Sequence, residues 1–221
     1  MSPENRWALA LSIEVAVSAT ILNALIGIPL AYFLARRRFW GHAAVDLLVT
    51  LPLVLPPTVT GYYLIALLGR RGFLGAPLYE ATGWTVAFTP LAAVIAATVM
   101  ALPLLVRTAR VAIESVDQNL ERAAFTLGRA EWRTALEVTL PLARNGILAG
   151  LVLAFARALG EFGATLMLAG NIPGKTQTLP LSIYTAVQTG EAGQAMTLVA
   201  MLTLLSCVVV VASARLGARA L

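Results

Sequence analysis

The chain has 221 residues, of which 59% are hydrophobic and only 12% are charged. So large an apolar fraction excludes an ordinary soluble domain and indicates a membrane protein. The net charge of +5 would suit nucleic acid, but the basic residues lie between apolar runs without interleaved aromatic side chains, so no nucleic-acid partner is expected.

The first long apolar run covers residues 8–35 and predicts a membrane-spanning helix. It is roughly twice the length of a secretory apolar region, so a cleaved signal peptide is not expected. Three arginines, Arg36 to Arg38, follow it at once. Because basic clusters beside a span mark its cytoplasmic end, the N-terminus is predicted to lie outside the cell.

A second run, residues 43–68, predicts a span with three prolines inside it. These are Pro52, Pro56 and Pro57. Proline removes a backbone donor and would kink or break the helix, and in a membrane such breaks persist where protein or a water-filled path supplies new partners. Thr58 and Thr60 are therefore candidate pathway-lining residues. The alternative is a packing kink against a neighbouring span.

Residues 69–83, which contain several glycines, predict an outer loop before a third span at 84–106. Two arginines follow that span and mark the inner side again. The chain becomes polar from residue 114, where Ser115 or Asp117 can cap a helix.

The polar stretch at 121–141 has the pattern of two short helices that meet at a glycine. Before Gly128, apolar residues recur at helical spacing and charged residues occupy the remaining surface. The apolar set is Leu120, Ala123, Ala124 and Leu127, and the charged set is Glu121, Arg122 and Arg129. Gly128 can take the left-handed conformation that ends a helix, and Pro141 is predicted to end the second one. Small alanines inside a charged rim suit a surface that another protein approaches closely.

The fourth predicted span, residues 145–168, holds two charged residues, Arg157 and Glu161. Four residues apart, they share a helix face and can neutralise each other, which offsets the cost of charge in a membrane. They are candidate gate or pathway residues, and the alternative is a self-satisfied pair that fixes helix packing. Gly160 and Gly163 beside them allow close helix contact or a local bend.

Residues 170–190 predict an outer loop with a short re-entrant or interfacial helix near 181–188. The Gly-Lys-Thr at 174–176 invites comparison with a phosphate loop. Gly170 is one residue too close for that motif and no strand precedes it. Neither a nucleotide nor any other cofactor is therefore expected to bind this chain.

The last span is predicted at 195–213, which makes five spans in all. Of the basic residues outside the spans, eleven fall in segments predicted to be inside and four in segments predicted to be outside. The inner set is Arg36, Arg37, Arg38, Arg107, Arg110, Arg122, Arg129, Arg133, Arg144, Arg215 and Arg219, and the outer set is Arg6, Arg70, Arg71 and Lys175. This imbalance predicts that the 114–141 loop and the C-terminus face the cytoplasm.

The frame of Ala123-Ala124, Gly128 and Leu140-Pro141 resembles the EAA loop of ABC importer permeases, the cytoplasmic coupling helix that docks on the ATPase subunit. One departure is that Arg122 stands where the family consensus has Glu, with Glu121 one position earlier. The resemblance implies a role in ATPase coupling for all of these residues. From the residues alone, the alternative is an amphipathic helix at the membrane surface that merely links two spans.

Residues 156–190, with the segments 51–64 and 69–72 and the EAA-like loop, resemble the permease subunits of molybdate ABC importers over nearly the whole chain. Sulfate, thiosulfate and tungstate permeases are relatives that share much of this pattern. The resemblance implies one all-α polytopic permease domain, residues 1–221, with the type I ABC importer fold. It also implies a homodimer in the cell membrane, two cytoplasmic ATPase subunits that use the ATP, and an extracellular or periplasmic molybdate-binding protein.

Two other classes are alternatives. A membrane-embedded enzyme would need a reactive constellation, and the sequence has no HExxH motif and no paired carboxylates in a span. Its single histidine, His42, and single cysteine, Cys207, make no metal-ligand set. A passive channel or an assembly subunit would not need the 121–141 stretch. The sequence therefore predicts a transporter subunit without a catalytic site of its own.

Overall fold

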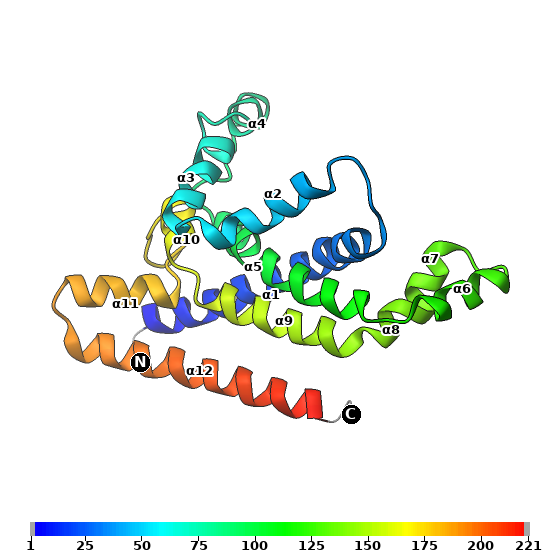
Figure 1. Cartoon of the computed structure of the whole chain (residues 1–221). Coiled ribbons are helices and arrows are strands. Elements are labelled where there is room, and N and C mark those ends of the chain that lie inside the picture. Colours follow the sequence, from blue (N-terminus) through cyan, green and yellow to red (C-terminus); the bar gives the residue numbers. More distant parts are fainter. Residues whose placement is uncertain (1–2, 219–221) are drawn as a thin grey trace.

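The computed structural model describes residues 3–218, which form helices joined by short connections and contain no β-strand (Figure 1). The predicted all-α class is therefore confirmed. Two residues of the predicted inner side, Arg215 and Arg219, lie outside the residues whose side chains are described.

Three helices pack against one another at the centre: α1 (Pro3–Arg36), α5 (Pro90–Glu114) and α9 (Arg144–Leu159). Their backbones approach closely because small residues line the contacts. A Cβ added to Gly146 would lie 2.3 Å from the Cβ of Ala112, so no larger residue fits there. Without a hydrophobic driving force between helices in lipid, such close packing of small residues holds membrane helices together.

The second predicted span is broken into α2 (His42–Val54) and α3 (Pro57–Leu68), which meet at a bend of 120°. Leu55 and Pro56 are extended, and proline at the first position of α3 suits a helix start. Pro52, by contrast, lies within α2 without ending it. The break predicted from the prolines is confirmed, and the assignment of residues 43–68 to one span stays a prediction.

The fourth predicted span is broken as well, between α9 and α10 (Gly163–Ala169). The helix ends at Gly160, which confirms the predicted bend beside the glycines. The two breaks lie against each other, because a Cβ on Gly163 would be 2.9 Å from the Cβ of Pro57 and 3.4 Å from the backbone nitrogen of Thr58. Helices α3 and α10 therefore pack as one unit that starts at both breaks.

The structure adds detail on both sides of the third predicted span. The glycine-containing outer loop contains a short helix, α4 (Gly75–Thr82). The third span begins at Pro90 rather than at residue 84, because the Thr89 hydroxyl accepts the N–H of Ala92 and caps the helix there. Because no helix-breaking proline or glycine lies at residues 104–114 to stop it earlier, α5 runs to Glu114. It therefore includes Arg107 and Arg110, which were expected after the span.

The polar stretch forms four short pieces: α6 (Gln118–Thr126), α7 (Glu131–Thr134), a π-helical turn η1 (Ala135–Thr139) and α8 (Leu140–Leu142). We call residues 118–142 the polar hairpin. It lies at one end of the long helices, and the turn between α11 and α12 lies at the other (Figure 1).

Helix α11 (Leu179–Gln188) confirms the short helix predicted near 181–188, and α12 (Ala192–Ala218) follows it. Three straight helices are long and apolar enough to cross a membrane: α1, α5 and α12 over Ala192–Val211. Counting each bent helix pair as one span gives up to five. The number five therefore stays a prediction.

Contact between α3 and α10 depends on Gly61, whose added Cβ would lie 2.7 Å from the Met167 Cβ and 2.9 Å from the Ala164 Cα. Gly61→Ala is expected to lower the free energy of unfolding by about 1–3 kcal/mol, because the two helices must separate to admit the methyl group. Gly193→Ala is the control, since a Cβ there meets nothing within 4 Å. Thermal unfolding in detergent measures both, and equal midpoints would contradict this packing.

Candidate functional site

The first arm of the polar hairpin is built as its sequence predicts. Asp117 caps α6 by accepting the N–H of Asn119 on Oδ1 at 2.9 Å, which confirms one of the two predicted caps. Gly128 has φ of 78°, the left-handed conformation expected of it. The N–H of Arg129 then donates to the Ala124 carbonyl at 3.1 Å, so the chain reverses directly after α6.

The second arm departs from the prediction at its end. Pro141 lies inside α8 and does not end the helical path, because the preceding residues 135–139 take a π-helical turn. The direction changes at Ala143 instead, where the segment Glu131–Leu142 meets α9 at 77°.

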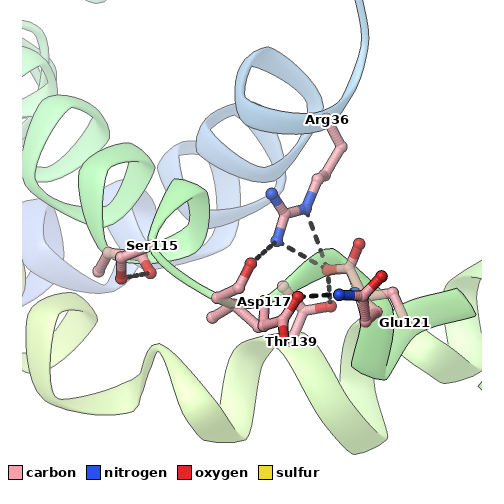
Figure 2. Close-up of polar contacts among 8 residues, drawn as sticks. Arg36, Ser115, Asp117, Glu121 and Thr139 are labelled. Carbon is pink, nitrogen blue, oxygen red and sulfur yellow. Dashed lines mark hydrogen bonds and ion pairs between the residues drawn. The ribbon is translucent and has the colours of Figure 1, made fainter. Parts of the chain in front are cut away.

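Glu121 lies in the interior of the hairpin's base, where it pairs with Arg36 at the end of α1 (Figure 2). One carboxylate oxygen, Oε1, accepts Arg36 Nε at 3.0 Å and the Thr139 hydroxyl at 2.6 Å, and lies 2.9 Å from Arg36 Nη2. Nη2 also donates to the Val116 carbonyl at 3.2 Å. The side chains of the pair are only 8% and 10% exposed.

The predicted rim position of Glu121 is therefore wrong. An amphipathic pattern shows that charged and apolar residues occupy different faces, but not which face the rest of the chain covers. Here Arg36, the last residue of α1, attracts the carboxylate inward. Arg122 does lie at the surface, as predicted.

A second ion pair joins the same end of α1 to the other arm. Arg37 Nε donates to Glu131 Oε1 at 3.2 Å, and Arg37 Nη2 contacts the second carboxylate oxygen. Both side chains are about half exposed. Solvent screens such a pair, so it adds less stability than the buried one.

The outer surface of the hairpin is apolar in several places. Leu127 is 83% exposed and Trp132 is 61% exposed, and three further large apolar side chains, Leu120, Phe125 and Leu136, are about half exposed. Ala123 also faces outward, whereas Ala124 is buried. Gly128 and Pro141 are exposed and Leu140 is partly so. Clustered exposed apolar groups among charged residues are suited to contact with another protein.

The candidate pathway residues lie around the two helix breaks. Arg157 Nη1 and Glu161 Oε2 are 2.7 Å apart, which confirms that the two charges pair. They do not share a helix face, because α9 ends at Leu159 and Glu161 lies in the break before α10. Glu161 is 1% exposed, and its other oxygen accepts the N–H of Ala164 at the start of α10. Thr58 is exposed beside the break between α2 and α3, and the buried hydroxyl of Thr60 has no hydrogen-bond partner.

Two residues of the buried cluster were not found from the sequence. Arg36 was assigned only to membrane orientation, and Thr139 was given no role of its own. The run of three arginines at residues 36–38 is the one signal that could have suggested an acidic partner for Arg36. It does not indicate which Asp or Glu residue that partner is. Among residues 3–218, no three His, Cys, Asp or Glu side chains gather as a metal ion would need.

A family model described as "Binding-protein-dependent transport system inner membrane component" matches residues 27–221. The chain belongs to this family and is a multi-pass permease subunit of a membrane transport system. The "Molybdenum transport system permease protein ModB" of Escherichia coli (strain K12) is 50% identical over 190 residues, which cover 85% of this chain and 83% of that protein. The protein of the same name from Haemophilus influenzae is 47% identical over 185 residues, covering 84% and 81%.

Solved structures show the same fold at low sequence identity. A chain of a bacterial alginate ABC transporter, in complex with an alginate pentasaccharide-bound periplasmic protein, has a TM-score of 0.80 and 17% identity, over 99% of this chain and 80% of that one. A chain of the MetNI methionine ABC transporter in an inward-facing conformation has a TM-score of 0.72 and 18% identity, over 100% of both chains. The fold is that of ABC importer permeases.

The different burial of the two ion pairs predicts different costs. Glu121→Ala is expected to lower the free energy of unfolding by about 3–5 kcal/mol, because it leaves the Arg36 charge buried and unpaired. Glu131→Ala, the control at the exposed pair, should cost at most about 1 kcal/mol. Unfolding of the two purified variants in detergent gives the comparison, and similar losses would contradict the burial of Arg36 and Glu121.

Proposed function

We propose that this chain is the transmembrane permease subunit of an ATP-driven importer for molybdate. The observation that carries the proposal is its 50% identity over most of its length to a permease of molybdenum transport. The fold agrees with this role, since permeases of ABC importers share it. ATP is hydrolysed by a partner subunit, because the Gly-Lys-Thr at 174–176 does not have the spacing of a phosphate loop.

The ATPase subunit docks on the outer surface of the polar hairpin. This surface offers Leu127 and Trp132 for burial, Ala123 and Gly128 for close approach, and Arg122 at the edge. The other residues of the EAA-like loop are not part of the docking surface. Glu121 and Ala124 are buried beneath it, and Leu140 and Pro141 connect the hairpin to α9. An amphipathic helix on the membrane surface would bury the same apolar side chains in lipid, and the co-purification test below distinguishes the two roles.

The hairpin end of the molecule faces the cytoplasm, with the N-terminus outside and the C-terminus inside. The excess of basic residues at this end supports the orientation. Two copies of the chain form the transmembrane path, and a periplasmic or extracellular binding protein delivers the anion to it. The complex of the alginate permease with a periplasmic protein supports this arrangement.

The path runs beside the two helix breaks, where Thr58, Thr60, Arg157 and Glu161 lie. Broken helices at membrane depth are typical of transporter sites and gates. Glu161 is paired with Arg157 and accepts the N–H of Ala164 at the start of α10, so it repels an oxyanion less than a free carboxylate would. Few donors converge there, and anion selection therefore belongs to the binding protein.

The substrate test uses the chain reconstituted in liposomes with its ATPase and its binding protein. ATP hydrolysis is measured with the binding protein loaded with molybdate, tungstate, sulfate or thiosulfate in turn. Stimulation by molybdate and tungstate alone is expected. Stimulation by sulfate or thiosulfate would keep the mechanism and assign the chain to that alternative branch, and no stimulation by any of the four would contradict the proposed oxyanion import.

The docking surface is tested by adding bulk where the ATPase approaches. Ala123→Trp is expected to reduce co-purification of the ATPase and to leave the unfolding midpoint of the chain unchanged, because Ala123 is exposed. Ala81→Trp is the matched control, since Ala81 is exposed on α4, away from the hairpin. Ala124→Trp is unsuitable, because it would overpack the buried side of α6. Undiminished co-purification of the Ala123→Trp variant would rule out this docking surface.

A further inference from the structure

The inner end of α1 holds both arms of the polar hairpin. Arg36 pairs with Glu121 on α6, the same carboxylate oxygen receives the Thr139 hydroxyl from η1, and Arg37 pairs with Glu131 on α7. Arg36 also binds the Val116 carbonyl in the connection before α6. The end of α1 therefore contacts both arms of the hairpin, α6 through Arg36 and α7 through Arg37. Figure 2 shows the contact of Arg36 with Glu121.

The buried part of this contact is difficult to separate. If the hairpin moved away from α1, Arg36 and Glu121 would both lose their partners in a site that water hardly reaches. Thr139, which is completely buried, belongs to the hairpin itself and orients the Glu121 carboxylate by donating its hydroxyl to the oxygen that binds Arg36. Exposed pairs such as Arg37–Glu131 exchange readily with water and impose no such constraint. The hairpin is thus expected to take α1 with it when it moves.

Helix α1 continues unbroken from this contact to the opposite end of the molecule. Its 34 residues correspond to a length of about 50 Å. Near the far end, the Ser12 hydroxyl accepts the N–H of Leu179, the first residue of α11, at 2.7 Å in a buried position. Gln194 of α12 donates to Asn5 there as well, at 3.3 Å. Of the neighbouring paths, α2–α3 and α9–α10 contain breaks, whereas α5 is unbroken like α1.

We propose that Arg36, Glu121 and Thr139 are positioning residues that make the polar hairpin and α1 move as one body. A displacement imposed on the hairpin by the ATPase then reaches Leu179 and α11 at the outer end through α1. The inference rests on the proposed function of the hairpin as the ATPase contact. It adds the route inside this chain by which that contact acts.

The rival explanation is that the cluster only stabilises the fold. A purely stabilising role would change the unfolding midpoint but not the ratio of stimulated to basal ATP hydrolysis in the assembled complex. That ratio, measured with the loaded binding protein, is therefore the readout. Stimulation of the wild-type complex is measured first, because it tests the proposed function. The ratio for each variant is then compared with the wild-type ratio.

Thr139→Val removes one donor to Glu121 and leaves the ion pair in place, so the complex is expected to assemble. We expect stimulation to fall while co-purification and basal hydrolysis stay at the wild-type level. Glu121→Gln should reduce stimulation further, by about fivefold or more. Asp46→Asn is the control, because Asp46 pairs with Arg110 between α2 and α5 and does not contact the hairpin. Wild-type stimulation in the first two variants would overturn the proposal.

A cross-link tests the one-body motion directly and does not depend on the anion. In a Cys207→Ser background, Arg37→Cys and Glu131→Cys place thiols where the exposed side chains now meet, within reach of a short bifunctional reagent. If α1 and the hairpin move together, the cross-linked complex hydrolyses ATP at the rate of the unlinked double variant. Loss of basal hydrolysis on cross-linking would show that the hairpin must separate from α1, and would overturn the proposal even if import of molybdate is correct.

Discussion

The buried ion pair of Arg36 and Glu121 is the interaction on which the arrangement of the polar hairpin depends. One carboxylate oxygen accepts the guanidinium and the Thr139 hydroxyl, so groups from α1, α6 and η1 meet at one atom. Because Glu121 of α6 points towards α1, Leu120 and Phe125 of the same helix are left on the surface. The same interaction therefore fixes the hairpin and exposes the face that a partner can bury.

The rest of the chain is organised by two kinds of backbone feature. Small residues let α1, α5 and α9 pack closely into a continuous centre. Proline and glycine break the two neighbouring helical paths, and the breaks meet where Gly163 lies against Pro57. A rigid centre beside a pair of interrupted helices is a suitable construction for a transporter, since one part can transmit motion while the other rearranges.

The two ends of the molecule have different chemistry. The hairpin end combines charged pairs with exposed apolar side chains, whereas the end near α11 contains hydrogen-bonded neutral groups such as Asn171, Gln177 and Thr185. Under the proposed function, the ATPase would contact the hairpin end and the binding protein the end near α11.

The sequence by itself determined the features that arise from local chemistry. Apolar runs predicted a membrane protein, prolines and glycines predicted where helices break, and Asp117 and Gly128 predicted the cap and the turn of α6. These predictions are correct because the effects of caps, turns and prolines act over only a few residues.

Only the tertiary structure decided which face of the hairpin is covered. Arg36 and Glu121 are 85 residues apart, and nothing in either local pattern specifies the partner. For the same reason the sequence could not distinguish exposed Ala123 from buried Ala124. The burial of a residue depends on what packs over it, and that is set by the path of the whole chain.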